Sequence, residues 1–189
     1  MNILIYAPNY LPATRYGGPI RSSHGLASAL ARAGHHVRVL TTDVDGPDRL
    51  DVPLNQPVYR DGVEIRYFPT RPPRRLYFAP DMAQAAGAAL DQADILHLNG
   101  CFLWPGPALA RQARRAGVGY VVSPRGMLQA DLIAGKSTLA KRLWITGVER
   151  PLLARAGAIH ATSDAELAGL ADLGLTLAPT KVIGNGIDA

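Results

Sequence analysis

The residues of this chain that could do chemistry follow directly after its apolar segments. His97 and Asn99 end one apolar run, Arg125 and Gly126 follow another, and Asn9 comes after a third. In an open parallel sheet, ligands bind beyond the carboxyl ends of the strands. Imidazole and amide groups hydrogen-bond hydroxyls, and the guanidinium fork fits phosphate or carboxylate. Collected at one sheet edge, these groups favour a polyhydroxylated or anionic ligand.

A pair of adjacent glycines, Gly17 and Gly18, stands before a predicted helix that begins at Pro19. Glycines let the backbone approach a ligand closely, and a helix N-terminus presents unpaired N–H groups and a positive dipole. Phosphate is the usual ligand of such a loop. The spacing is not G-x-G-x-x-G, so the dinucleotide fingerprint is absent. A tight turn that needs glycine for its shape alone is the alternative interpretation.

The elements that position these residues alternate between strand and helix. Residues 2–7 form an apolar run typical of a strand buried on both faces. The helix that follows has one apolar face and ends at Gly34, and residues 37–42 return as the second strand. This βαβ pattern continues along the chain and predicts a single α/β domain over residues 1–189, with a Rossmann-like, doubly wound parallel sheet and helices on both faces.

Further elements follow from turn and helix signals. Asp61-Gly62 joins segments 58–60 and 63–68 in a predicted hairpin, and polar residues 43–57 predict a loop. The remaining strands are expected at 95–98, 120–122, 159–161 and 181–183, and the remaining helices at about 81–91, 107–116, 137–155 (broken near Pro151) and 164–172. Ser163 and Glu166 have the spacing of a capping box at the start of the last helix.

Composition narrows the class of protein. Apolar residues make up 48% of the chain and charged residues 19%, which is typical of a globular domain. No run approaches a membrane span of roughly 18 residues, no cationic leader precedes the first strand, and the single cysteine, Cys101, excludes an intrachain disulfide. We therefore expect a cytoplasmic protein. The histidines lack zinc-ligand spacing, so we expect no metal. The net charge of +5 suits an anionic partner.

Five motifs together resemble family 4 glycosyltransferases, which are two-domain GT-B enzymes. The first is PNYLPATRYGGPIRSSHGLASALARAGHHVRVLTT, ending at residue 42, and it is similar to the opening of the first domain of that family. The others are ADILHLNG (93–100), SPRGML (123–128), HATS..E (160–166) and KVIGNGID (181–188), in the order and spacing of the family. Each motif is weak alone, whereas five in register identify the family rather than the substrate.

The resemblance implies roles for particular residues. By it, His97 holds a hydroxyl of the transferred sugar in the catalytic centre, and Gly17 and Gly18 approach the donor diphosphate. It places the acceptor beside Asn9, Tyr16, Asn99, Arg125 and Gly126. A buried structural histidine and a loop-supporting Arg125 ion pair are the alternatives. Glu166 is expected to cap its helix rather than to act in catalysis.

The resemblance also implies a reaction. We expect a retaining transfer of a sugar from a nucleotide-sugar donor to a glycan or lipid-linked glycan acceptor, without a metal or other cofactor, in bacterial cell-envelope polysaccharide synthesis. The main donor-binding motifs of the family belong to a second, C-terminal domain that this sequence does not contain. The 189 residues are then the N-terminal, acceptor-side half, inactive alone. The alternative is a self-contained phosphate- or nucleotide-binding regulatory module.

A basic segment bears on a further partner. Lys136, Lys141, Arg142, Arg150 and Arg155 alternate with apolar residues along the predicted helix 137–155. Two interpretations remain open: a packed helix with a solvated basic edge, or peripheral contact with anionic lipid on the cytoplasmic face of the inner membrane. Aromatic residues do not interleave with the basic ones, which argues against single-stranded nucleic acid as the partner.

Overall fold

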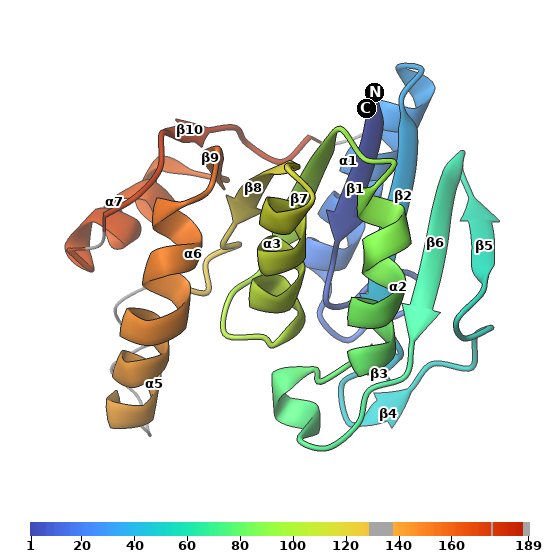
Figure 1. Ribbon diagram of the computed structural model, residues 1–189, viewed down its shortest axis with the longest axis horizontal. Helices are drawn as coiled ribbons and strands as arrows, with labels where there is room; N and C mark the ends of the chain where they lie inside the picture. Colours follow the sequence, from blue (N-terminus) through green and yellow to red (C-terminus); the bar gives the residue numbers. More distant parts are fainter. Residues whose placement is uncertain (129–137, 175, 187–189) are drawn as a thin grey trace.

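An eight-stranded sheet forms the centre of the protein, seen here in a computed structural model that describes residues 1–128, 138–174 and 176–186 (Figure 1). Its strand order is β10-β9-β8-β7-β1-β2-β6-β5, and every pairing is parallel except that of β5 with β6. The strands are β1 (Asn2–Tyr6), β2 (His36–Thr42), β5 (Pro57–Arg60), β6 (Val63–Phe68), β7 (Ile95–Asn99), β8 (Gly119–Ser123), β9 (Ala158–Ala161) and β10 (Thr180–Val182).

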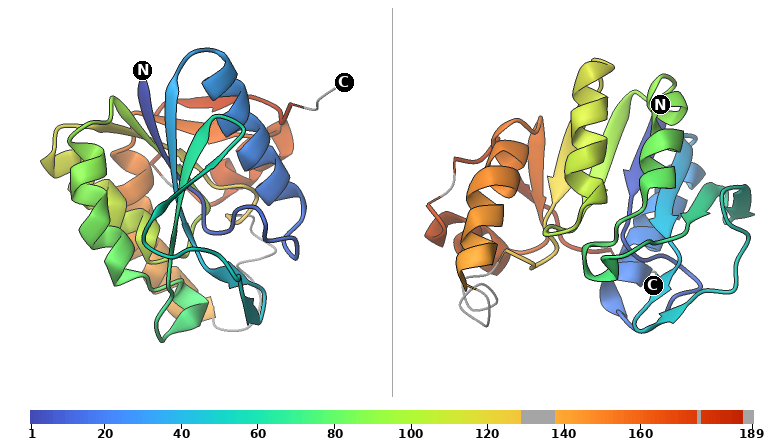
Figure 2. Two further views of the ribbon diagram at one scale, coloured as in Figure 1. Left: turned by 90° about the vertical axis from the view of Figure 1, so that its right-hand side faces the viewer. Right: turned by 60° about the horizontal axis from the view of Figure 1, so that its bottom comes forward.

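The sheet is covered on both faces, as the sequence predicts. Helix α1 (Gly18–Arg32) packs on one face, against a core that includes Ile5, Val39 and Ile65. Helices α2 (Pro80–Leu90) and α3 (Pro105–Arg115) cover the other face, where their apolar residues share a second core with Leu96 and Leu98. Figure 2 shows α1 and the α2–α3 pair on opposite sides of the strands. The doubly wound prediction is confirmed.

The order in which strands join the sheet reverses at β1, because β2 and β6 lie on one side of it and β7, β8, β9 and β10 on the other. This switch point separates β1 and β7 at their carboxyl ends, where loops leave in opposite directions. Asn9 follows β1, and Asn99 ends β7. The central strand β1 is buried from Ile3 to Tyr6, as its apolar sequence requires.

Several local predictions are confirmed. Asp61 and Gly62 join β5 and β6 with φ values of 50° and 79°, which are the positive angles of a type I′ hairpin turn. Gly34 follows α1 with φ of 87°, as a glycine after a helix end commonly does. The hydroxyl of Ser163 accepts a hydrogen bond from the Glu166 N–H at the start of α7 (Asp164–Asp172).

Two segments differ from the sequence prediction. The predicted loop 43–57 contains a small hairpin, β3 (Val44–Asp45) with β4 (Asp48–Arg49), whose strands are too short and polar to show a periodicity. The predicted helix over 137–155 is α5 (Thr138–Trp144), a π-helical turn η2 (Ile145–Glu149) and α6 (Arg150–Ala154). Pro151 has no N–H to continue the α-helical pattern, and the break lies just before it.

Candidate functional site

Two adjoining cavities open at the carboxyl edge of the sheet. The smaller, of about 290 Å³, and the larger groove, of about 920 Å³, share Pro19 and Arg125. The smaller cavity has largely apolar walls, formed by residues such as Tyr16, Ile20, Leu103 and Met127. The groove has mainly small and polar residues, among them Gly18, Arg21, Ser22, His160, Thr162 and Asn185.

Two asparagines form the polar floor of the smaller cavity. The Asn99 amide donates to the carbonyl of Tyr6 at 3.0 Å, and its oxygen accepts from Arg125 Nε at 3.0 Å. Asn9 donates to the carbonyl of Val44 at 2.7 Å and accepts from the hydroxyl of Tyr77 at 3.1 Å. Both side chains are buried, so these bonds fix the direction of each amide.

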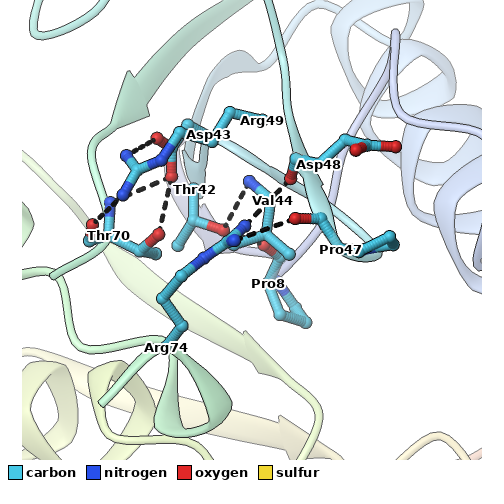
Figure 3. A network of polar contacts seen from close by, with 9 residues as sticks. All are labelled: Pro8, Thr42, Asp43, Val44, Pro47, Asp48, Arg49, Thr70 and Arg74. Carbon is cyan, nitrogen blue, oxygen red and sulfur yellow. Dashed lines mark hydrogen bonds and ion pairs between the residues drawn. The ribbon is translucent and has the colours of Figure 1, made fainter. Parts of the chain in front are cut away.

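Asp43, directly after β2, holds the β3–β4 hairpin in place (Figure 3). Its carboxylate is buried and accepts from the backbone N–H and the hydroxyl of Thr70, each at 2.9 Å, and from Arg49. Arg49 itself also donates to the carbonyl of Thr70 at 2.8 Å. Charge-assisted bonds of this kind are about twice as strong as neutral ones, so Asp43 ties β4 to the end of β6.

A second arginine also hydrogen-bonds the β3–β4 hairpin. Arg74 lies in the short 3₁₀ helix η1 (Arg74–Leu76) and donates to the carbonyls of Pro47 and Asp48, each at 2.9 Å (Figure 3). Tyr77 follows η1 directly and reaches Asn9. Hydrogen bonds therefore join the β3–β4 hairpin to η1, and Tyr77, which follows η1, lines the smaller cavity.

Arg125 stands between the two cavities on an unusual turn. Its φ is 56° and that of Gly126 is 74°, so two successive residues adopt a left-handed conformation. The side chain donates to Asn99 and, at 2.7 Å, to Asn185. Burial lowers the pKa of Arg125, and the carboxylate of Glu166 opposes that shift. A guanidinium group stays charged, and that of Arg125 is fixed by hydrogen bonds to two asparagines. It therefore suits recognition of a planar or tetrahedral anion.

Glu166 holds the Arg125–Gly126 turn. Its carboxylate accepts from the Gly126 N–H at 2.6 Å and from the N–H and hydroxyl of Thr162, each at 2.7 Å. The capping-box prediction is therefore half correct. Ser163 caps the helix, whereas the carboxylate of Glu166 reaches Thr162, one residue before Ser163, and the neighbouring strand end. Glu166 therefore has a structural role, but with other partners than the capping box predicts.

The glycine loop lies at the entrance of the groove. Gly17 precedes α1 with φ of 52° and ψ of −113°, and Gly18 is the first helical residue, so Pro19 is the second rather than the first. A Cβ built on Gly18 would meet no atom within 4 Å, which leaves the backbone open to a ligand. The N–H groups at the start of a helix have no partner within it and suit an anion.

His97 belongs to a chain of polar contacts across three strands. His97 Nε2 lies 2.7 Å from Ser123 Oγ, and Ser123 Oγ lies 2.8 Å from His160 Nδ1. His160 Nε2 then donates to the carbonyl of Ile183 at 2.8 Å. Burial, with smaller contributions from Arg125 and His160, lowers the pKa of His97 to about 3. His97 is therefore neutral at physiological pH.

Glu149 supports the loop that follows β7. It is fully buried in η2 and accepts from the N–H of Phe102 at 2.6 Å and from the indole of Trp144 at 2.8 Å. Phe102 has a φ of 60°, so the loop is strained where Glu149 binds it. Burial raises the pKa of Glu149, and the hydrogen bonds oppose this. Cys101, beside it, is a buried free cysteine.

The residues chosen from the sequence divide among these features. Asn9, Tyr16, Asn99 and Arg125 all line the smaller cavity, so the structure brings the predicted acceptor residues together. Gly18 lines the groove. Three others are not among the residues that line either cavity, and they shape the loops or belong to the polar chain: Gly17, Gly126 and His97.

Sequence reasoning missed three contributors. Ser123 and His160 lie in the SPRGML and HATS motifs, but their pairing with His97 depends on the order β7-β8-β9, which no local pattern shows. Glu149 has no sequence signal beyond an acidic residue in an apolar helix.

Lys136 of the predicted basic patch lies outside the described residues. Within residues 1–128, 138–174 and 176–186, no three His, Cys, Asp or Glu side chains group as metal ligands, and no helix is long and apolar enough to cross a bilayer.

Comparison with solved structures establishes the fold class. Sucrose-phosphate synthase from Thermosynechococcus elongatus superimposes with a TM-score of 0.68 at 18% identity, over 99% of this chain and 48% of that protein. HepE from Anabaena, solved in complex with UDP-glucose, superimposes with a TM-score of 0.62 at 20% identity, over 100% of this chain and 44% of that protein. The chain thus spans about half of these GT-B glycosyltransferases and has the Rossmann-like fold that they contain.

The family follows from the sequence itself. The profile of the glycosyl transferase 4-like domain matches residues 17–186, which is most of the chain. The chain belongs to this glycosyltransferase family, as the five motifs predicted. No curated protein sequence matches it.

Proposed function

We propose that this chain is the acceptor-side domain of a retaining glycosyltransferase, which transfers a sugar from a nucleotide-sugar donor to a glycan or lipid-linked glycan of the bacterial cell envelope. The observation that carries the proposal is the meeting of the two cavities at Arg125. A polar groove beside a helix N-terminus suits a diphosphate, and an amphipathic cavity with two fixed amides suits a sugar or a lipid-linked glycan.

The donor occupies the groove in this proposal. The N–H groups at the start of α1 and the guanidinium of Arg125 face the diphosphate and stabilise the charge that develops on it as the sugar leaves. In this proposal no metal is required, because the Arg125 cation and the N–H dipoles supply counter-charge. HepE, which has the same fold, was solved with UDP, UDP-glucose, and UDP and glucose. That supports a nucleotide sugar as the donor class.

The acceptor occupies the smaller cavity. Tyr16, Ile20 and Met127 provide apolar walls for a ring face or a lipid, and Asn9 and Asn99 provide hydrogen-bonding groups beneath. Arg125 lies between donor and acceptor, close to where the bond is made. His97 holds a hydroxyl of the transferred sugar and stays neutral, so it acts by hydrogen bonding rather than as a cation.

A membrane-associated acceptor agrees with one exposed surface. Leu139 and Leu143, four residues apart on α5, are 73% and 66% exposed, and Arg142 lies exposed between them. Leucines with a flanking arginine suit the interface of an anionic bilayer. In this proposal the protein is cytoplasmic and contacts the inner face of the inner membrane peripherally.

Calorimetric titration with UDP-glucose and with other nucleotide sugars tests the proposal. The chain alone is expected to bind weakly and to transfer nothing, and the protein extended through a second, donor-binding domain is expected to bind tightly and to yield a product of unchanged anomeric configuration. Tight binding by the 189 residues alone would instead identify a self-contained nucleotide-binding module.

A further inference from the structure

When both imidazole rings are neutral, the contact chain from His97 to Ile183 allows one arrangement of protons. A backbone carbonyl only accepts, so the hydrogen at the Ile183 end belongs to His160 Nε2. In the neutral form of His160 this leaves Nδ1 without a hydrogen, so Nδ1 accepts the hydroxyl hydrogen of Ser123. Ser123 Oγ in turn has only a lone pair left for His97, so His97 Nε2 must carry the hydrogen.

The opposite ring nitrogen of His97 is left without a hydrogen. The ring is neutral, because burial and the nearby cation Arg125 disfavour a second proton. With Nε2 protonated, Nδ1 keeps a free lone pair, and none of the described residues hydrogen-bonds it. A neutral imidazole in this tautomer can accept a hydrogen bond at Nδ1 but cannot donate one there.

We propose that Ser123 and His160 are positioning residues, which hold His97 in the Nε2–H tautomer and so make Nδ1 an acceptor for a hydroxyl of the transferred sugar. The identity of the ligand rests on the proposed function, whereas the tautomer does not. The Ser123 hydroxyl is fully buried, so water does not compete for its bonds. Because the Ser123 hydroxyl donates to His160, it can only accept from His97, which lies 26 residues away in sequence.

Side-chain ¹⁵N NMR of the histidine-labelled chain measures the tautomer directly. We expect both His97 and His160 in the Nε2–H form. Ser123→Ala removes the acceptor of that hydrogen and is expected to give His97 as a tautomer mixture. His160→Leu frees the Ser123 hydroxyl to donate to His97 Nε2, so the Nδ1–H form should gain population. Ser28→Ala, at another buried serine, is the matched control and should change neither ring.

Titration of the same proteins with UDP and UDP-glucose tests the consequence. Loss of a fixed acceptor for one hydroxyl is expected to weaken UDP-glucose binding to Ser123→Ala about three- to tenfold, with UDP binding unchanged. His97 in the Nδ1–H form in the wild type, or an equal loss for both ligands, would overturn the proposal. A wild-type chain that binds neither ligand would overturn the proposed function and the sugar as ligand. The ¹⁵N NMR spectra would still test whether Ser123 and His160 set the tautomer of His97.

Discussion

Replacement of Glu166 by glutamine tests how the Arg125 turn is held. The carboxylate of Glu166 faces only donors: the N–H of Gly126 on one oxygen, and the N–H and hydroxyl of Thr162 on the other. Glutamine has one oxygen and one NH₂ group. In either orientation its NH₂ group therefore faces a backbone N–H, although the Thr162 hydroxyl can turn to accept.

The magnitude follows from this geometry. One charge-assisted hydrogen bond is lost, at about 1.5–3 kcal/mol, and a backbone N–H beside a buried side chain is left unpaired, at about 1–3 kcal/mol. We expect Glu166→Gln to lower the free energy of unfolding by about 3 kcal/mol. For a domain of this size each kcal/mol shifts the melting temperature by about 2–4 °C, so a fall of about 6–12 °C is expected.

Thermal denaturation followed by circular dichroism measures this fall. Asp164→Asn is the matched control, because it removes the same charge from the same helix at an exposed position. That control should lose less than about 1 kcal/mol, which is the usual contribution of a carboxylate near a helix N-terminus. If the two variants melt within 2 °C of each other, Glu166 does not hold the turn as described.

Three further predictions concern the glycine loop, His97 and α5. Gly18→Val should leave the melting temperature within about 3 °C of wild type, because its Cβ meets no atom, yet reduce transfer by the two-domain enzyme at least tenfold; unchanged turnover would remove the loop from the mechanism. His97 is neutral in the fold with a pKa near 3, while in the unfolded chain it gains a proton below about pH 6.5, so stability falls as the pH drops through that window. From pH 7.5 to 5.0 the wild type should lose about 2 kcal/mol more than His97→Gln in urea denaturation, and equal losses would contradict the lowered pKa. The wild type should sediment with phosphatidylglycerol vesicles and not with phosphatidylcholine vesicles, and Leu143→Asp should abolish sedimentation with the anionic vesicles; retention on them would exclude α5 as the contact.

The sequence predicts those features that are determined by neighbouring residues. The strands of the parallel sheet, the Asp61–Gly62 turn and the Ser163 cap each depend on a few consecutive positions. The clustering of Asn9 and Asn99 also follows from sequence, because both stand at strand ends and parallel strands end at one edge.

Features that depend on contacts between distant elements could not be predicted. The β3–β4 hairpin owes its shape to Asp43 and Arg74, whose partners lie up to 27 residues away. Glu166 reaches Gly126 only because β8 and β9 are neighbours, and Glu149 reaches Phe102 across 47 residues. Such bonds are specified by the packed fold, not by a local pattern.

Mapping of UDP-glucose on the ¹⁵N-labelled chain by amide chemical shifts tests most directly whether the groove receives the donor. Weak binding is sufficient for this measurement, so the 189 residues can be used alone. We predict shifts of the amides of Gly17, Gly18, Arg125 and Asn185, with none at Asp94 on the opposite edge of the sheet. Shifts centred on Asp94, or no shifts at millimolar ligand, would contradict the assignment of the groove to the donor.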